Sequence, residues 1–137
     1  MNVVAHGVDL VDCKRLAEAI HRHGQRFLQR IYTANELAYC CGRKREIEHL
    51  AGRFAAKEAV LKVLGTGWKN GIAWTDIEVM NKPSGQPVVR LSGQCRKIAD
   101  QQGLSSIIIS ISHIDTHAIA SAIASAESSG GAIGIGD

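Results

Sequence analysis

Apolar residues recur at helical spacing through the middle of the chain. At 100° per residue, the positions that project within about 80° of one another are Leu50, Phe54, Leu61 and Leu64. This stripe predicts a helix over roughly residues 46–64. Glycine favours helix C-termini, so the sequence Gly65-Thr66-Gly67 predicts where the helix ends. Lys57 points into the middle of the stripe, which is an unusual position for a charge.

The segment before this helix combines strand and helix patterns. Residues 3–11 are rich in β-branched side chains and predict a strand, with Asp9 on its apolar face. Asp12 is placed to cap the next helix. The apolar positions of that helix are Leu16, Ala19, Ile20, Phe27 and Leu28. Thr33 and Glu36 have the spacing of a capping box, which predicts a short helix through about Cys40.

The second half of the chain is dominated by strand patterns. Residues 76–80 and 88–91 predict a hairpin with a long loop, and a helix is predicted over about 93–102. Strands are predicted over 106–113 and 118–126. The sum is an α+β fold in one small domain, residues 1–126. Residues 127–137 are rich in glycine, and we expect a disordered tail there.

Composition limits the function classes without choosing one. With 45% hydrophobic and 21% charged residues, the 137-residue chain is typical of one globular domain. It has no uninterrupted apolar run of about 18 residues and no signal-peptide pattern, so we expect a cytoplasmic protein that does not enter a membrane. The four cysteines lack zinc-site spacing and are expected to be free thiols. A net charge of +3 does not by itself indicate nucleic-acid binding.

Charge is unevenly distributed, and the segment between Cys13 and Arg30 is strongly basic. Its cations are Lys14, Arg15, Arg22, Arg26 and Arg30, against Glu18 as its carboxylate. We expect this segment to attract an acidic partner. The alternative is an ordinary solvated helix face.

The run Arg53-Phe-Ala-Ala-Lys57-Glu58-Ala-Val-Leu-Lys62 places three cations and one carboxylate in an otherwise apolar helix. Together with Asp9 and the strand end at His113, it could bind Mg²⁺ and a phosphate, because Mg²⁺ commonly takes one or two carboxylates plus water and phosphate oxygens. The alternative is purely structural: a solvated ion pair between Glu58 and Lys62, and a Lys57 whose stem lies along apolar surface.

Several short motifs occur in order along the chain. They are Gly7-Val-Asp9-Leu-Val, the Arg53 to Lys62 run, Gly65-Thr-Gly67, Gly71-Ile, Asp76-Ile-Glu-Val, Gly85-Gln-Pro-Val and Ser110-Ile-Ser-His113. As an ordered set over residues 3 to about 126, they resemble the holo-[acyl-carrier-protein] synthase family of the 4′-phosphopantetheinyl transferase superfamily.

The resemblance implies a mostly antiparallel sheet packed on a long central helix, and a homotrimer with active sites at subunit interfaces. Members of the family move 4′-phosphopantetheine from coenzyme A to a serine of apo acyl carrier protein, with Mg²⁺, and release adenosine 3′,5′-bisphosphate. The implied partners are therefore apo acyl carrier protein and coenzyme A, in fatty acid biosynthesis. Nucleic acid and membranes are not implied.

The resemblance also assigns roles to residues. Asp9 and Glu58 are implied as the metal carboxylates, and Lys62 is the candidate for neutralising the leaving bisphosphate; these three are the expected catalytic residues. The candidates for the coenzyme A site are Arg53, Lys57, Lys62, Gly65, Pro87 and His113. Lys14, Arg15, Arg22 and Arg26 are expected to dock the carrier protein.

Structural alternatives stay open for several of these residues. Arg53 and Lys57 could form salt bridges, His113 could be a satisfied polar group at a strand end, and Gly65 could only stop the helix. Pro87 could only shape a turn. The proton acceptor for the serine is open between Glu58 and Asp9, each acting through water.

Two other functions compete with this interpretation. One is a transferase acting on carrier domains of polyketide or peptide synthases, although such enzymes often have about twice this length. The other is a non-catalytic module that binds nucleotides or an acidic protein. The sequence leaves open the range of carrier proteins and acyl-coenzyme A accepted, Mg²⁺ against Mn²⁺, and the role of the tail.

Overall fold

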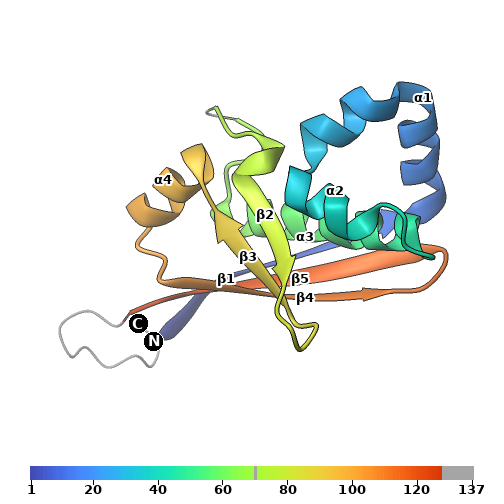
Figure 1. Ribbon diagram of the computed structural model, residues 1–137. Coiled ribbons are helices and arrows are strands. Elements are labelled where there is room, and N and C mark those ends of the chain that lie inside the picture. Colours follow the sequence, from blue (N-terminus) through green and yellow to red (C-terminus); the bar gives the residue numbers. More distant parts are fainter. Residues whose placement is uncertain (70, 128–137) are drawn as a thin grey trace.

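A computed structural model describes residues 1–69 and 71–127. The strands lie in the order β1 (Asn2–Asp12), β5 (His117–Ala126), β4 (Ser106–His113) in one antiparallel sheet, and β2 (Ile77–Asn81) pairs with β3 (Pro87–Leu91) in a second. The α+β class and the antiparallel pairing agree with prediction. The expectation of one sheet was wrong, because the hairpin forms a sheet of its own above the three-stranded one (Figure 1).

The predicted helices are present with close boundaries. They are α1 (Cys13–Ile31), α2 (Ala34–Cys40), α3 (Glu46–Leu64) and α4 (Gly93–Gln101), with the short 3-10 helix η1 (Trp74–Asp76) before β2. The Asp12 carboxylate accepts hydrogen bonds from the amides of Lys14 and Arg15, and the Thr33–Glu36 capping box is complete. Gly65 ends α3 in the left-handed region, at φ 76°. The tail expected from residue 127 lies, apart from Glu127, outside the described residues.

Helix α3 lies between the two layers of the fold. One side packs on β1, β5 and β4, and the other meets α1, α2 and β2. Twelve of its 19 residues are consequently buried. No helix of the described residues is long and apolar enough to span a bilayer.

Small residues let α3 approach the sheet closely. The inward positions of β5 are all alanine, at 118, 120, 122 and 124, and each is almost completely buried. A Cβ added to Gly7 of β1 would lie 2.2 Å from the carbonyl oxygen of Ala59, so any larger residue would force β1 away from α3. This close contact places Asp9, two residues further along β1, beside the part of α3 that carries Glu58 and Lys62.

Helix α1 is broken rather than continuous, which corrects the expectation of one regular helix. Gly24 has φ 63° and ψ −146°, a conformation outside the helical region that glycine adopts readily. The two segments of α1 therefore run in different directions and form an arch at one end of the molecule (Figure 1). The arch carries the basic residues predicted to bind an acidic partner.

Candidate active site

Asp9 and Glu58 open into one pocket, although 49 positions separate them in sequence. The pocket has a volume of 620 Å³ and is formed by β1, α1, α3 and the start of β5. Its polar lining includes Asp9, Glu58 and Arg15, and its apolar lining includes Leu16, Phe27 and Phe54. The structure therefore brings the two predicted metal carboxylates together, next to one of the predicted docking residues.

Lys62 forms an ion pair with Asp9. Its ammonium is 3.3 Å from Asp9 Oδ1 and donates to the carbonyl oxygen of Val8 at 2.8 Å. The Lys62 side chain is 55% exposed, so it can turn toward a bound anion at little cost. The ion pair that Lys62 makes is with Asp9, not the helical pair with Glu58 considered from the sequence.

The charge state of Glu58 reflects both its burial and its neighbour. Burial raises the pKa of Glu58, and the negative charge of Asp9 raises it further. A hydrogen bond from the Trp68 indole and the charge of Lys62 act in the opposite direction. Two carboxylates that repel each other in one pocket form a donor set that a divalent cation would stabilise.

Lys57 does not belong to this site. Its ammonium is completely buried and lies 2.8 Å from Glu36 Oε1, and it also donates to the carbonyl oxygens of Trp74 and Ile77. An ammonium has three donors, and all three have protein acceptors here. These contacts do not support the expectation that Lys57 contacts coenzyme A, because no Lys57 donor is left to reach a phosphate and the side chain is buried.

A second cluster of predicted residues lies toward the start of α3. His113, at the end of β4, has Nδ1 2.7 Å from Glu48 Oε1, and its ring packs against His49 with centroids 5.6 Å apart. His49 in turn contacts Tyr39 at 5.7 Å. Glu48 precedes Glu58 by ten residues, about 15 Å along the helix axis. Because His113 is bound to Glu48, it lies far from Asp9 and Glu58 of the same chain.

Arg53 connects this cluster to the hairpin. Its guanidinium lies over the Tyr39 ring, 4.2 Å from the centroid, and Nη2 donates to Asn81 Oδ1. Asn81 faces Pro87 in the β2–β3 register, so Arg53 and Pro87 lie at the same end of the hairpin. Arg53 is buried, and its Nε has no hydrogen-bond partner among the described residues. The sequence run gave no sign of the Tyr39, His49 and Glu48 side chains that complete this cluster.

The docking candidates are all on the surface of the arch. Lys14 and Arg15 are exposed on its first segment with Arg22, and Arg26 is exposed on the second. Arg15 also lines the carboxylate pocket. The basic surface therefore continues into the pocket that contains Asp9 and Glu58.

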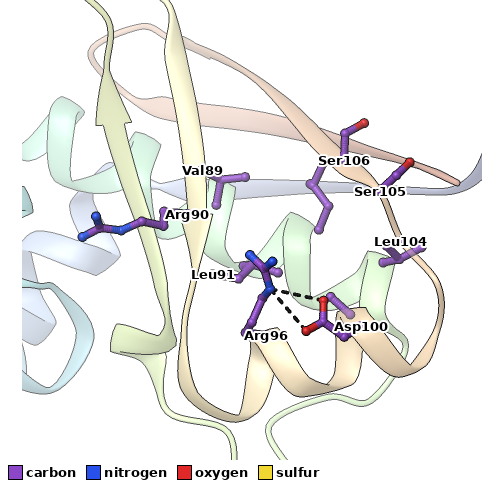
Figure 2. A pocket seen from close by; sticks show the side chains of 10 residues that line it. Val89, Arg90, Leu91, Arg96, Asp100, Leu104, Ser105 and Ser106 are labelled. Atoms are coloured by element: carbon purple, nitrogen blue, oxygen red, sulfur yellow. Dashed lines mark hydrogen bonds and ion pairs between the residues drawn. The ribbon is translucent and has the colours of Figure 1, made fainter. Parts of the chain in front are cut away.

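Another pocket, of 330 Å³, lies between β3, α4 and β4 and contains none of the predicted site residues. Figure 2 shows that its charged side chains are already paired or directed elsewhere. Arg96 and Asp100 bind each other, and Arg90 extends to the other side of its strand, where its guanidinium is 2.7 Å from Glu78. This pocket offers no constellation for phosphate chemistry.

Comparison with known proteins agrees with this geometry. Residues 5–122 match the model of the 4′-phosphopantetheinyl transferase superfamily. The holo-[acyl-carrier-protein] synthase of Protochlamydia amoebophila is 45% identical over 117 residues, which cover 85% of this chain and 93% of that protein. The chain therefore belongs to the 4′-phosphopantetheinyl transferase superfamily, a class of enzymes, and within it is similar over most of its length to holo-[acyl-carrier-protein] synthases.

Solved structures give the same result. The crystal structure of holo-[acyl-carrier-protein] synthase from Neisseria meningitidis superposes with a TM-score of 0.82 at 30% identity, covering 90% of this chain and 98% of that one. The Helicobacter pylori enzyme in complex with coenzyme A gives 0.78 at 30% identity, covering 88% and 99%. The family resemblance predicted from the ordered motifs is thus confirmed.

Proposed function

We propose that this protein transfers 4′-phosphopantetheine from coenzyme A to a serine of apo acyl carrier protein and releases adenosine 3′,5′-bisphosphate. The observation that carries the proposal is the convergence of Asp9 and Glu58 on one pocket beside Lys62. Family membership supplies the reaction class, and this convergence supplies a place for it.

The pocket is suited to Mg²⁺. Among the described residues, no group of three or more histidine, cysteine or acidic side chains could hold a metal ion. Two carboxylates match the usual protein contribution to Mg²⁺, whose other positions go to water and substrate phosphate oxygens. Asp9 and Glu58 would hold the ion, and the ion would supply positive charge to the reacting pyrophosphate.

Each of the proposed site residues has a separate role in the transfer. The serine oxygen forms a bond to the β-phosphorus of coenzyme A as the bond to the bridging oxygen breaks, and the leaving bisphosphate carries the extra charge. Lys62 is placed to neutralise that charge after turning from Asp9. The serine proton passes to water held by Glu58 or Asp9. The residues left for the coenzyme A nucleotide are Arg53, Gly65, Pro87 and His113.

We assign carrier-protein docking to the arch of α1. Acyl carrier proteins are acidic, and the exposed Lys14, Arg15, Arg22 and Arg26 give the arch a matching charge. Because Arg15 lines the carboxylate pocket, a protein docked on the arch would hold its serine near Asp9 and Glu58.

We further propose a homotrimer whose active sites lie between subunits. The face of the three-stranded sheet opposite α3 exposes large apolar side chains, among them Val8, Leu10, Ile108 and Ile119, at 43% to 63% of their surface. Such a face is typical of an interface. A neighbouring subunit would also supply a second wall for the nucleotide, because His113 lies far from the carboxylate pair in its own chain.

We place this activity in the cytoplasm and in fatty acid biosynthesis. The four cysteines are free thiols, which is usual in a reducing compartment.

Mass spectrometry of apo acyl carrier protein tests the central proposal. Incubation with coenzyme A, Mg²⁺ and this protein should add the mass of phosphopantetheine to the carrier protein. A carrier protein whose serine is replaced by alanine is the control. An unchanged mass with the intact carrier protein, under conditions where a known transferase modifies it, would refute the proposal.

A further inference from the structure

Trp68 reaches back to the carboxylate of Glu58 from the loop that follows α3. Its indole Nε1 donates to Glu58 Oε1 at 3.5 Å. Gly65 and Gly67 lie between α3 and Trp68 with positive φ, 76° and 61°, a backbone conformation that glycine adopts readily. A side chain ten positions after Glu58 returns to its carboxylate.

The indole is held in place by other aromatic rings. The Trp68 and Trp74 rings are 3.7 Å apart between centroids and inclined by 31°, and Trp74 packs on Phe54 at 4.9 Å. The carbonyl oxygen of Trp74 accepts a hydrogen bond from Lys57 at 3.2 Å. Phe54 and Lys57 lie on the same helix as Glu58, so the stack fixes Trp68 relative to the carboxylate it contacts.

We propose that Trp68 is a positioning residue for Glu58 and tunes its affinity for the divalent cation. A metal carboxylate can rotate about its last bond, and a donor to one oxygen fixes which oxygen faces the ion. Hydrogen-bond partners of metal ligands contribute about 10- to 100-fold to metal affinity or activity. This inference rests on the proposed metal site at Asp9 and Glu58.

Two conservative variants separate the indole donor from the stack. Trp68→Phe keeps an aromatic ring against Trp74 but removes the N–H that reaches Glu58. Trp74→Phe, the matched control, keeps a ring under Trp68 and leaves the N–H donor to Glu58 in place. Mn²⁺ binding is measured by calorimetry without substrates. Trp68→Phe should weaken it about tenfold, and Trp74→Phe should change it little.

The Mg²⁺ dependence of transfer provides an independent test. In Trp68→Phe, the Mg²⁺ concentration for half-maximal transfer should rise by a similar factor, while KM for the carrier protein stays near that of the parent. A ring that only supports the fold would alter thermal stability without this selective effect on metal affinity. Equal Mn²⁺ affinities in Trp68→Phe and the parent would overturn the inference.

A measurement on Trp74→Phe covers the case in which Trp68→Phe does not fold. The chain has two tryptophans, so Trp68 is the single indole of this variant. Saturating Mn²⁺, a paramagnetic quencher, should reduce its emission, and adding Glu58→Gln should abolish the effect. Unquenched emission at saturation would overturn the inference.

A separate measurement tests the metal site on which the inference rests. If Asp9→Asn and Glu58→Gln bind Mn²⁺ like the parent, the proposed metal site itself is wrong.

Discussion

The Lys57 ammonium lies 2.8 Å from the Glu36 carboxylate, and both side chains are completely buried. Burial lowers the pKa of Lys57, whereas the charge of Glu36 raises it. Glu36 also accepts a hydrogen bond from the amide of Val79 at 2.7 Å, so the pair joins α2, α3 and β2. Removing one partner would leave the other charge buried without compensation.

We expect Lys57→Met to lower the free energy of unfolding by about 3 to 5 kcal/mol. Urea denaturation measures the change, and Lys62→Met is the control, because the Lys62 side chain is 55% exposed and its pair with Asp9 contributes at most about 1 kcal/mol. Combining Lys57→Met with Glu36→Leu should recover part of the loss. Equal stability of Lys57→Met and Lys62→Met would show that the buried pair does not support the fold.

Asp9→Ala and Glu58→Ala should each abolish transfer while the protein stays folded. Each removes one of the two proposed metal carboxylates, and each side chain borders a pocket rather than the core. Transfer is measured at increasing Mg²⁺, with thermal unfolding as the control for the fold. Near-normal turnover of either variant at saturating Mg²⁺, with an unchanged melting temperature, would contradict the two-carboxylate site.

The local signals in this sequence predicted most of the fold. Asp12, Thr33 and Gly65 have side-chain or backbone preferences that fix helix ends, and the structure has helix ends at each of them. The break at Gly24 was missed, because a glycine inside an apolar helical pattern has the same periodicity whether the helix continues or turns. The division into two sheets was missed because strand patterns do not specify their partners.

The candidate site was predictable only where residue type determined the chemistry. Asp9 and Glu58 stood out as carboxylates on apolar faces, and the structure places both at one pocket. Lys57 stood out for the same reason, yet its partner Glu36 belongs to another helix and was assigned only to a capping box. Trp68 gave no signal, because an aromatic residue after a glycine pair has no fixed partner until the loop folds back.

Glu78 should make stability depend on pH in the acid range. The Thr33 hydroxyl hydrogen bond, at 2.5 Å, is the main cause that lowers the Glu78 pKa, with Asn35 and Arg90 adding to it against burial. A lowered folded-state pKa stabilises the protein above the unfolded value, about 4.3, and this contribution is lost as pH falls through the folded value.

Glu78→Gln should therefore lower stability at neutral pH, and the difference from the parent should shrink below about pH 4. Urea denaturation across this range measures the effect. Asp100→Asn is the control, because its pair with Arg96 is exposed and contributes little. A difference between Glu78→Gln and the parent that stays constant with pH would show that ionisation of Glu78 is not the source.

Ile108→Asp should dissociate the proposed trimer. Ile108 is 62% exposed on the outer face of the three-stranded sheet, opposite Ile123 in the register, and a charge there would be costly inside an interface. Sedimentation at micromolar concentration should show monomers with reduced transfer. Lys97→Glu, at an exposed position of α4, also makes the surface more negative and should leave the assembly intact. An active Ile108→Asp trimer would place the interface elsewhere.

Reversing Arg22 or Arg26 to Glu should raise KM for the carrier protein while KM for coenzyme A changes little. Both residues are exposed on the arch of α1, on opposite sides of Gly24, and neither lines the pocket of Asp9 and Glu58. They can therefore act on the encounter and orientation of an acidic protein rather than on the phosphoryl group.

The dependence of carrier-protein KM on salt should also weaken in both reversals, because fewer opposite charges remain to be screened. Steady-state kinetics with each substrate varied in turn separates the two effects. Lys97→Glu on α4, at the other end of the molecule from the arch (Figure 1), makes the same charge change away from the proposed docking surface and should leave both KM values unchanged. If Arg22→Glu and Arg26→Glu behave like Lys97→Glu, or raise both KM values equally, the arch does not dock the carrier protein.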